Sequence, residues 1–490
     1  MAVTAGQEHG LFIGGKVVEP ASGEMRDLRE PATGESLARA AMAGEADIDR
    51  AVEAARSALD GPWGKTPPNE RARLLQALAD SMVANRKELA ELEARNVGKA
   101  ISSVKAEVAG AVENFRFFGS VVGSISGRSN PIGGSLLSYT LKEPVGVCAQ
   151  IVPWNYPLMM AAWKLAPALA AGCATVLKPD PRTPLSALWL AELAAEVGFP
   201  AGVVNVLPAP GTPVGSHLVS HPGVDKVAFT GSTATGGEIM RLCADPIKRV
   251  TLELGGKSPS ILFADADLDE AIPASVWSIY YSAGQSCEAR SRLLVEASVY
   301  DEVVSRFAEA AGRLRVGDPL DAETHMGSLI DPGHRDRVHG YVERAGAGGA
   351  EVVLGGEVPD GPGAFYPATV VANAAAGSEA AQEEIFGPVV TVTPFADERE
   401  AVAIANGVRY GLMATVWAGD PNRAQRLARR IDAGTIGLNM PYTAFPGVAF
   451  GGFKQSGFGR ELSAGALEEY LEEKSVIVAA GNRPSNPFGL

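Results

Sequence analysis

The sequence predicts an α/β protein with two doubly wound domains, each a parallel sheet covered by helices. The first sign is an alternation of short apolar runs with helical segments from Pro144 to Cys243. The second is a similar alternation that begins after Gly255. Strand–helix alternation of this kind is typical of parallel sheets with crossover helices. A chain of 490 residues is long enough for about two to four domains.

The region before the first alternation is expected to be mixed. Residues 11–45 read as short strands and turns, and the expected helices run over Asp47 to Leu59, Asn69 to about Gly98 and Ser102 to Phe118. Asn69 is a suitable N-cap for the second helical stretch. That stretch also carries an apolar stripe at helical spacing, formed by Leu74, Leu75, Leu78 and Met82.

Each alternating region supplies its own sheet and helices. In the first, we expect strands over Val147 to Val152, Ala174 to Leu177, Gly202 to Val206 and Val224 to Phe229, and helices over Pro157 to Ala170, Ser186 to Val197 and Ala234 to Cys243. In the second, we expect strands over Ser260 to Phe263, Arg292 to Val295, Glu351 to Leu354 and Val389 to Phe395, and helices over Asp267 to Ser282, Ser298 to Ala311 and Asp420 to Ile431. Two more strand-like segments, Ser135 to Leu141 and Lys474 to Ala480, fit neither region.

Composition limits the function classes. Hydrophobic residues make up 46% of the chain and charged residues 20%, as in globular proteins. The net charge of −14 argues against nucleic acid or an anionic membrane as a partner. Neither a secretory signal nor an apolar stretch of the roughly 20 residues that a membrane span requires is visible. Because the cysteines (Cys148, Cys173, Cys243 and Cys287) lack paired spacing, we expect free thiols, no metal site and a cytoplasmic protein.

Two short segments carry the chemistry. Cys287 ends the segment Gly284-Gln285-Ser286-Cys287, and Glu253 precedes Leu254-Gly255-Gly256. A thiol and a carboxylate are the minimum needed to trap a carbonyl carbon covalently and then release it with water. They are 287 − 253 = 34 residues apart, so only the fold can bring them together. Most free cysteines are inert and buried, so the thiol is informative only together with its neighbours.

Together with four further motifs, these segments resemble the NAD(P)-dependent aldehyde dehydrogenase superfamily, in its hydrolytic branch that does not acylate coenzyme A. The motifs follow the family's order and are Pro153-Trp154-Asn155-Tyr156-Pro157, Phe229-Thr230-Gly231-Ser232, Glu384-Ile385-Phe386-Gly387-Pro388 and Gly452-Phe453-Lys454-Gln455-Ser456-Gly457. The resemblance implies a Rossmann-like NAD(P)-binding domain over 1–125 and 146–254, a catalytic domain over 255–455, and a small oligomerisation β-sheet from 126–145 and 456–490. It further implies a homodimer or homotetramer.

The resemblance also implies the catalytic roles. Cys287 would attack the aldehyde carbon to give a thiohemiacetal, and Glu253 would activate water against the thioester. The Asn155 amide and the backbone N–H of the nucleophile would stabilise the oxyanion. Lys164 is also expected to be one of the catalytic residues. Glu288 follows the nucleophile directly, and its charge is expected to raise the thiol pKa.

The expected cofactor is NAD or NADP. Gly231 and Ser232 open a helix whose N-terminus suits a pyrophosphate, although the GxGxxG pattern is absent. Pro181 stands where NAD-preferring relatives often place a glutamate, so Asp180 is the candidate to bind the ribose beside Lys178. The complete predicted cofactor set is Ile151, Val152, Pro153, Trp154, Lys178, Asp180, Gly231, Ser232, Glu384 and Phe386.

Aromatic and methionine side chains are expected to line a tunnel for a small-molecule aldehyde. Such residues are more often core, but by motif alignment the tunnel set is Tyr156, Met159, Met160, Trp163, Tyr281, Tyr442 and Phe450. An aromatic wall suits apolar or aromatic aldehydes. It can also hold a quaternary ammonium group by cation–π contact.

Three alternatives stay open. Glu384, which the resemblance puts at the nicotinamide ribose, is a second candidate base. A cysteine hydrolase acting on esters or thioesters would share the thiol, but it normally needs a histidine partner, and none of the six histidines lies within these motifs. A catalytically silent protein on the same fold is the third, although Cys287, Glu253 and Asn155 are all intact.

Overall fold

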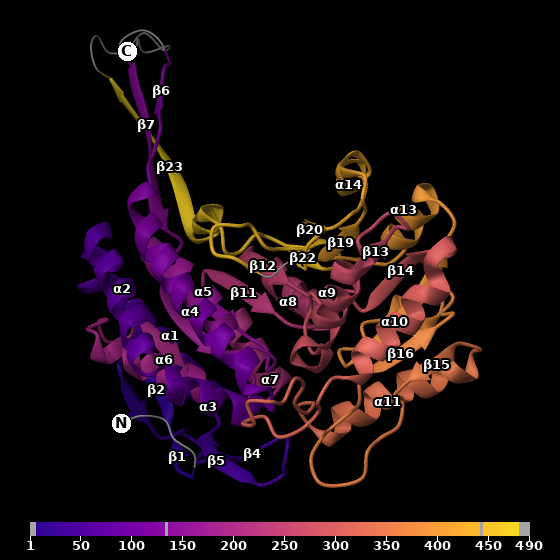
Figure 1. The fold of residues 1–490 in the computed structure, drawn as a ribbon. Coiled ribbons are helices and arrows are strands. Elements are labelled where there is room, and N and C mark those ends of the chain that lie inside the picture. Colours follow the sequence, from indigo (N-terminus) through magenta and orange to yellow (C-terminus); the bar gives the residue numbers. More distant parts are fainter. Residues whose placement is uncertain (1–5, 133–135, 442–443, 480–490) are drawn as a thin grey trace.

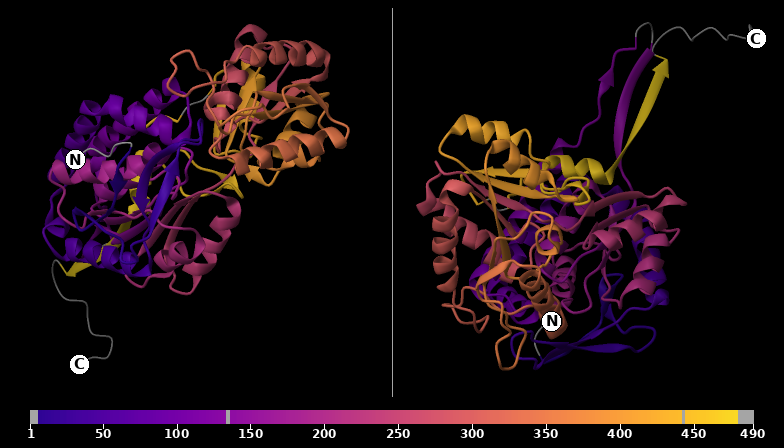
Figure 2. Two further views of the ribbon diagram at one scale, coloured as in Figure 1. Left: turned by 90° about the horizontal axis from the view of Figure 1, so that it is seen from below. Right: turned by 90° about the vertical axis from the view of Figure 1, so that its right-hand side faces the viewer.

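Two large sheets stand in separate α/β bodies that face each other, and a narrow arm projects from the first body (Figures 1 and 2). The computed structural model describes residues 6–132, 136–441 and 444–479. The two bodies confirm the predicted fold class. The N-terminal half of the chain forms most of the first body, and the region after Gly255 forms most of the second.

The sheet of the first body has the strand order β22-β12-β11-β8-β9-β10-β2-β3 within the described residues. Its strands from β12 to β10 run parallel, and β2, β3 and β22 add antiparallel edges. The strands are β2 (Leu11–Ile13), β3 (Lys16–Val18), β8 (Val147–Ile151), β9 (Ala174–Lys178), β10 (Val204–Val206), β11 (Lys226–Thr230), β12 (Arg249–Glu253) and β22 (Gly457–Phe458). Ligands bind at the carboxyl ends of such parallel strands, and Glu253 is the last residue of β12.

Helices cover both faces of this sheet. They are α1 (Glu45–Asp60), α2 (Pro68–Ala84), α3 (Arg86–Val97), α4 (Ile101–Val121), α5 (Pro157–Ala171), α6 (Leu185–Glu196), α7 (Thr212–Ser220) and α8 (Thr233–Ala244). The predicted N-cap at Asn69 is wrong, because the helix begins one residue earlier at Pro68, and proline suits a first helical position. The stretch to Gly98 is also broken into α2 and α3 at Asn85, whose Nδ2 donates to the Ser81 carbonyl.

The second body is built on a sheet of strand order β15-β16-β17-β14-β13-β19-β20, again within the described residues. Its strands are β13 (Pro259–Leu262), β14 (Arg292–Glu296), β15 (Glu351–Leu354), β16 (Thr369–Ala372), β17 (Val389–Phe395), β19 (Met413–Trp417) and β20 (Thr435–Leu438). Its helices are α9 (Leu268–Tyr280), α10 (Tyr300–Gly312), α11 (Pro332–Ala347), α12 (Glu379–Gln382), α13 (Glu398–Asn406) and α14 (Pro421–Ala428). β15 and β17 have the predicted bounds, whereas the helix expected from Asp420 is shorter, because Asp420 is its N-cap and it ends at Ala428.

The projecting arm joins two segments that lie far apart in the sequence (Figure 1). β7 (Leu136–Pro144) pairs antiparallel with β23 (Leu471–Ala479) along its whole length, and β6 (Ser129–Asn130) adds a short edge. The pairing confirms the predicted third sheet, although Ser135 and Ala480 lie outside the described residues. Apolar side chains remain exposed on the arm, namely Leu137, Leu141, Ile477 and Val478.

The predicted domain ranges stay a prediction. The C-terminal stretch assigned to the oligomerisation sheet divides between two places, since β22 joins the sheet of the first body and only β23 enters the arm. Small sheets elsewhere contain β1 (Glu8–His9), β4 (Met25–Arg29) and β5 (Ser36–Ala41), and β18 (Tyr410–Gly411) with β21 (Phe453–Lys454).

None of the helices in the described ranges has both the length and the apolar character required to cross a lipid bilayer.

Candidate active site

Cys287 follows a left-handed turn at the end of α9. Ser282, Ala283 and Gly284 have φ angles of 57°, 54° and 70°, in a region that residues other than glycine rarely adopt. A Cβ on Gly284 would lie only 2.0 Å from the Gly387 carbonyl oxygen. Glycine is therefore required where the thiol loop packs against the loop that carries Glu384.

A single cavity of about 1050 Å³ brings the predicted catalytic groups together. Cys287, Glu253, Asn155 and Glu384 all line it, and its walls come from both α/β bodies. The sequence predicted that the thiol and the carboxylate face a shared pocket, and the cavity confirms this.

The surroundings of Cys287 disfavour the thiolate. Burial is the main cause that raises the pKa of its thiol well above the usual value, and the charges of Glu288, Glu384 and Glu253 raise it further. Glu288 thus lies close enough for its charge to disfavour the thiolate. Arg290 holds the Glu288 carboxylate at 2.8 Å, which fixes this charge beside the nucleophile.

We expect Glu288→Gln to shift thiol reactivity towards lower pH. The thiolate is the reactive form, and loss of the Glu288 charge removes one of the causes that raise its pKa. The rate of Cys287 alkylation by iodoacetamide, followed across pH, checks this. Glu113→Gln is the matched control, because Glu113 lines the same cavity but is not among the groups that raise the thiol pKa. Identical profiles for E288Q and the wild type would contradict the assignment.

The Glu253 carboxylate is buried and lacks a hydrogen-bond partner within the described residues. Only 4% of the residue is exposed, and a Cβ on Gly451 would approach its Oε1 to 2.8 Å. Burial, followed by the nearby charge of Glu461, raises the pKa of Glu253 well above its usual value. A carboxylate held in this way suits proton transfer near neutral pH.

Lys164 lies beside this carboxylate but does not line the cavity. Its ammonium group is fully buried on α5 and forms an ion pair with Glu461. Glu461 itself lines the cavity. Glu461 was not predicted from the sequence. It lies in no recognised motif, and nothing near it indicates that it forms an ion pair with a lysine almost 300 residues earlier.

Asn155 is fixed against the thiol loop. Its Nδ2 donates to the Gln285 carbonyl oxygen at 2.8 Å. Since an amide nitrogen carries two hydrogens, one N–H remains for a ligand in the cavity that Asn155 lines.

Six of the predicted cofactor residues line the cavity, and the part that they form is called its cofactor end. The predicted residues Pro153, Trp154, Gly231, Ser232, Glu384 and Phe386 line it. Ser232 caps α8 by accepting from the Thr235 N–H, and the Thr230 hydroxyl at the same edge is buried without a hydrogen-bond partner in the described part of the chain. An unpaired hydroxyl beside a helix N-terminus suits a phosphate-bearing ligand.

Glu384 is held at this end by the two-glycine segment. Its Oε1 accepts from the Gly256 N–H at 3.0 Å, and a Cβ on Gly255 would lie 2.1 Å from its Oε2. Burial raises the pKa of Glu384 to about 7. Gly255 therefore leaves room for the carboxylate, whereas a Cβ on Gly256 would lie 2.2 Å from the Cys287 carbonyl oxygen.

Four predicted cofactor residues lie outside the cavity lining, namely Ile151, Val152, Lys178 and Asp180. They occupy the end of β8 and the segment from the last residue of β9. The Asp180 carboxylate accepts from the backbone N–H, Nε and Nη2 of Arg182. Burial lowers the pKa of Lys178.

Aromatic and methionine side chains line a further part of the cavity, called its aromatic wall. The predicted residues that line it are Tyr156, Met159, Met160, Trp163, Tyr281 and Phe450, while Tyr442 lies outside the described residues. Trp163 and Phe450 pack edge to face at 5.1 Å between ring centroids. Sequence reasoning missed Trp277 and Phe445, although Trp277 stands one helical turn before Tyr281 and helical spacing could have indicated it.

A buried ion pair supports this wall. Lys99 donates to both carboxylate oxygens of Glu107, at 2.8 and 2.9 Å, and its ammonium lies 3.3 Å from the Tyr156 ring centroid. Glu107, which lines the cavity, also accepts from the Tyr281 hydroxyl at 3.2 Å. The ion pair therefore fixes two aromatic rings of the wall, those of Tyr156 and Tyr281. Neither Lys99 nor Glu107 was predicted from the sequence.

One group of possible metal ligands occurs in the described ranges, formed by Asp49, His217 and His221. It lies between α1 and α7 and lines no part of the cavity. His221 Nδ1 accepts the Gly223 N–H at 2.9 Å, so its Nε2 carries the proton and faces Asp49 Oδ1 at 3.3 Å. The ring is thus oriented as a hydrogen-bond donor to the carboxylate.

The fold and the cavity are those of a two-domain α/β enzyme with a thiol between the domains. The profile of the Aldehyde dehydrogenase family matches residues 17–476. An aldehyde dehydrogenase of Emericella nidulans is 42% identical over 477 residues, which cover 97% of this chain and 96% of the relative. The chain belongs to the aldehyde dehydrogenase family.

Solved structures agree with this assignment. The NAD+ complex of an aldehyde dehydrogenase from Bacillus cereus has a TM-score of 0.95 at 44% identity and covers 97% of both chains. Betaine aldehyde dehydrogenase from Staphylococcus aureus, in complex with NAD+, has a TM-score of 0.96 at 38% identity and covers 98% of this chain and 97% of that chain.

Proposed function

We propose that this chain oxidises an aldehyde to a carboxylic acid with NAD or NADP, through a thiohemiacetal and a thioester on Cys287. The observation that carries the proposal is the single cavity onto which Cys287, Glu253, Asn155 and Glu384 all open. A thiol, a base and an oxyanion donor that open onto one chamber are the parts that this reaction needs.

The first half of the reaction uses the thiol and the amide. The Cys287 thiolate adds to the aldehyde carbon, a C–S bond forms, and the carbonyl oxygen takes the negative charge. The free N–H of Asn155 Nδ2 and the backbone N–H of Cys287 stabilise this oxyanion. NAD(P)+, when bound, would supply the acceptor for the hydride that leaves the carbon, which would return the oxygen to a carbonyl and leave a thioester on Cys287.

The second half uses Glu253. Its carboxylate removes a proton from water, the water oxygen adds to the thioester carbon, and the C–S bond breaks to release the carboxylic acid and the thiolate. The Lys164–Glu461 ion pair lies next to this carboxylate and tunes its pKa. Glu384 remains the alternative base, although its hydrogen bond to the Gly256 N–H favours a holding role.

The cofactor would lie along the carboxyl ends of the first sheet. The start of α8, with Gly231 and Ser232, would hold the pyrophosphate, and Lys178 would contact the adenosine ribose. Asp180 already accepts hydrogen bonds from Arg182, and Pro181 offers no carboxylate. Rates measured separately with NAD+ and NADP+ distinguish the two cofactors.

The substrate would be an apolar or aromatic aldehyde. The Trp163–Phe450 pair and Met159 support this class, because they form an apolar wall near the thiol. A quaternary ammonium aldehyde is the alternative, since the same rings offer cation–π contacts and betaine aldehyde dehydrogenase is a structural neighbour.

Homo-oligomer formation and a cytoplasmic location are also part of the proposal. The strands β7 and β23 present exposed Leu137, Leu141 and Ile477, and a small projecting sheet is marginal unless a partner covers it. A second copy of the chain would supply that cover as a dimer or tetramer.

A panel of aldehydes, run with NAD+ and NADP+ separately, tests the function. We expect the absorbance of reduced nicotinamide to rise with neutral aromatic aldehydes and to rise less with quaternary ammonium aldehydes of similar size. Hydrolysis of esters without reduction of either cofactor would favour the cysteine hydrolase instead. His325 lines the cavity, but its Nδ1 accepts the Arg315 N–H, so it is poorly placed to serve that rival as a base for Cys287. If neither the aldehydes nor the esters were turned over, a non-catalytic protein would be favoured.

A further inference from the structure

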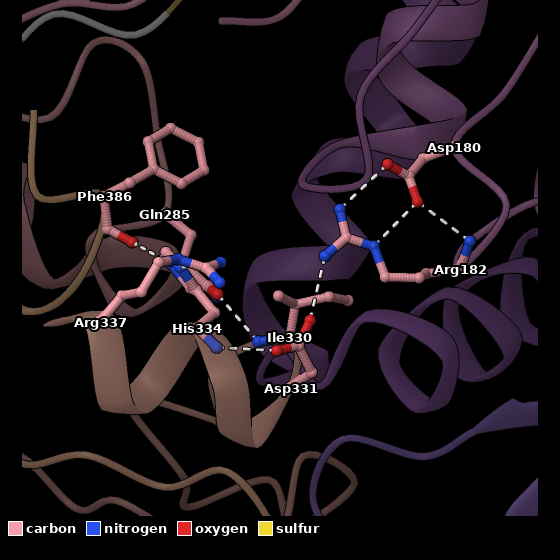
Figure 3. A network of polar contacts seen from close by, with 8 residues as sticks. All are labelled: Asp180, Arg182, Gln285, Ile330, Asp331, His334, Arg337 and Phe386. Atoms are coloured by element: carbon pink, nitrogen blue, oxygen red, sulfur yellow. Dashed lines mark hydrogen bonds and ion pairs between the residues drawn. The ribbon is translucent and has the colours of Figure 1, made fainter. Parts of the chain in front are cut away.

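A chain of polar contacts joins the two α/β bodies and reaches Phe386, which lines the cavity (Figure 3). Arg182, which follows β9 of the first body, binds Asp180 through Nε and Nη2 at 2.9 and 3.0 Å. Its Nη1 donates to Asp331 Oδ2 in the second body, also at 3.0 Å. The planar guanidinium is thus held by carboxylates on both sides of the domain boundary.

Asp331 links the Arg182 guanidinium to the start of α11. It is the N-cap of that helix, and its Oδ1 accepts the His334 N–H at 2.7 Å. Burial opposes ionisation, but the hydrogen bonds from His334 and Arg182 hold the pKa of Asp331 below its usual value. The carboxylate therefore stays charged, and the start of α11 is fixed to the first body.

The His334 ring has a defined tautomer. Arg337 Nη2 lies 3.1 Å from His334 Nδ1, and a guanidinium can only donate, so Nδ1 accepts. Nε2 therefore carries the proton and donates to the Phe386 carbonyl oxygen at 2.7 Å. Burial lowers the pKa of His334 to about 4, so this neutral donor persists at neutral pH.

The residue that receives this hydrogen bond has an unusual backbone. Phe386 has a φ of 58°, a left-handed conformation that costs on the order of 1–3 kcal/mol for a bulky side chain. Trp154 packs edge-on against His334 and Phe386, with centroids at 5.5 and 5.3 Å, and the Arg182 guanidinium lies 5.1 Å from its ring. Trp154 and Phe386 both line the cavity, as does Glu384 two residues earlier.

We infer that Arg182, Asp331 and His334 form an interdomain clamp that holds the Phe386 peptide in its left-handed conformation. In this clamp His334 is a positioning residue, because it keeps Glu384 and Phe386 aimed at the cofactor end without lining the cavity itself. The effect on the cofactor rests on the proposed function, whereas the effect on the loop follows from the contacts alone. Without the His334 donor, the Phe386 carbonyl loses its partner and the 384–388 segment loosens.

The test compares His334→Ala, His334→Gln and His339→Ala. Glutamine offers an amide N–H for the Phe386 carbonyl, so H334Q should restore much of the wild-type behaviour. His339 is the matched control, because it lies on the same helix but contacts the Tyr366 hydroxyl instead. Hydrogen exchange of the 384–388 segment is measured without cofactor, and binding of NADH and NADPH is measured by calorimetry.

We expect H334A to speed exchange of this segment and to weaken binding of the reduced cofactor by about tenfold, since loss of a buried hydrogen bond typically costs about 1–3 kcal/mol. H334Q should recover to within about threefold and H339A should match the wild type. Asp331→Asn keeps a capping oxygen but weakens the Arg182 contact, so it should give a smaller change in the same direction. Thermal unfolding of each variant shows whether it has folded.

The outcomes separate the clamp from the proposed function. Unchanged exchange in folded H334A, or equal changes in H334A and H339A, would overturn the clamp whatever the wild type binds. Faster exchange in H334A with rescue by H334Q would support it. If in addition the wild type bound neither NADH nor NADPH, the clamp would stand and the proposed function would fail.

Discussion

Cys287→Ala is expected to abolish aldehyde oxidation, with a loss of at least about 10⁴-fold. The thiol is the only protein nucleophile that the proposed reaction uses, and no covalent intermediate can form without it. Binding of the reduced cofactor should survive, because the groups assigned to the cofactor, such as Gly231, Ser232 and Glu384, are all retained in this variant. Initial rates of nicotinamide reduction and fluorescence titration with NADH check the two parts.

Cys243→Ala provides the matched control. Cys243 is a buried thiol on α8 that lines no part of the cavity, so its loss should leave turnover close to the wild-type rate. Preserved oxidation in C287A would refute the assignment of the nucleophile. Loss of cofactor binding in C287A would instead show that the variant had disturbed the fold.

Glu253→Gln is expected to trap the enzyme after its first half-reaction. The amide is similar in size to the carboxylate but cannot take the proton from water, so hydrolysis of the thioester should slow by about 10²–10⁴-fold. One equivalent of reduced nicotinamide per active site should appear in a burst, and intact mass spectrometry should find the acyl group on Cys287. In the wild type, thioester hydrolysis should rise with pH, because burial raises the pKa of Glu253 and only its ionised form is a base.

Glu384→Gln distinguishes the two carboxylates. Glu384 lines the cavity near the cofactor end and accepts the Gly256 N–H, so its loss should weaken cofactor binding without a burst. A burst of reduced nicotinamide in E384Q, together with normal steady-state turnover in E253Q, would instead make Glu384 the base and Glu253 the residue that holds the cofactor.

Local sequence patterns predicted the long elements well and the short ones poorly. The strands at Glu351–Leu354 and Val389–Phe395 have the expected bounds because their apolar runs end in clear turn signals. The two-residue strand at Gly457–Phe458 left no pattern, since only its pairing with β12 makes it a strand. The N-cap at Asn69 was mispredicted because the proline before it can begin a helix, so the boundary depended on a single residue.

The same division holds for the site. Motifs indicated Cys287, Glu253 and Asn155, because each lies in a segment with unusual local composition. Glu461 and the Arg182–Asp331 contact were missed, since each depends on a partner from a distant part of the chain. Glu107 was missed although Lys99 is only eight residues away, because its place at the cavity depends on the distant Tyr281. The sequence Asp331-Pro332 could have indicated the start of α11, but nothing local indicates that an arginine from the other domain binds there.

The return of the chain to the first sheet has a consequence for synthesis. Among the residues that the structure describes, the outer neighbour of β12 is Gly457–Phe458 and the counter-ion of Lys164 is Glu461. β12 carries Glu253. While a nascent chain ends before these residues, the outer edge of β12 has no hydrogen-bonded neighbour and the buried Lys164 has no counter-ion. Both an open strand edge and an unpaired buried charge destabilise the folded state. The reaction chamber can therefore close only after about residue 461 has left the ribosome. A chain released before that point would carry the Cys287 thiol, but the groups that surround the base Glu253 would be missing.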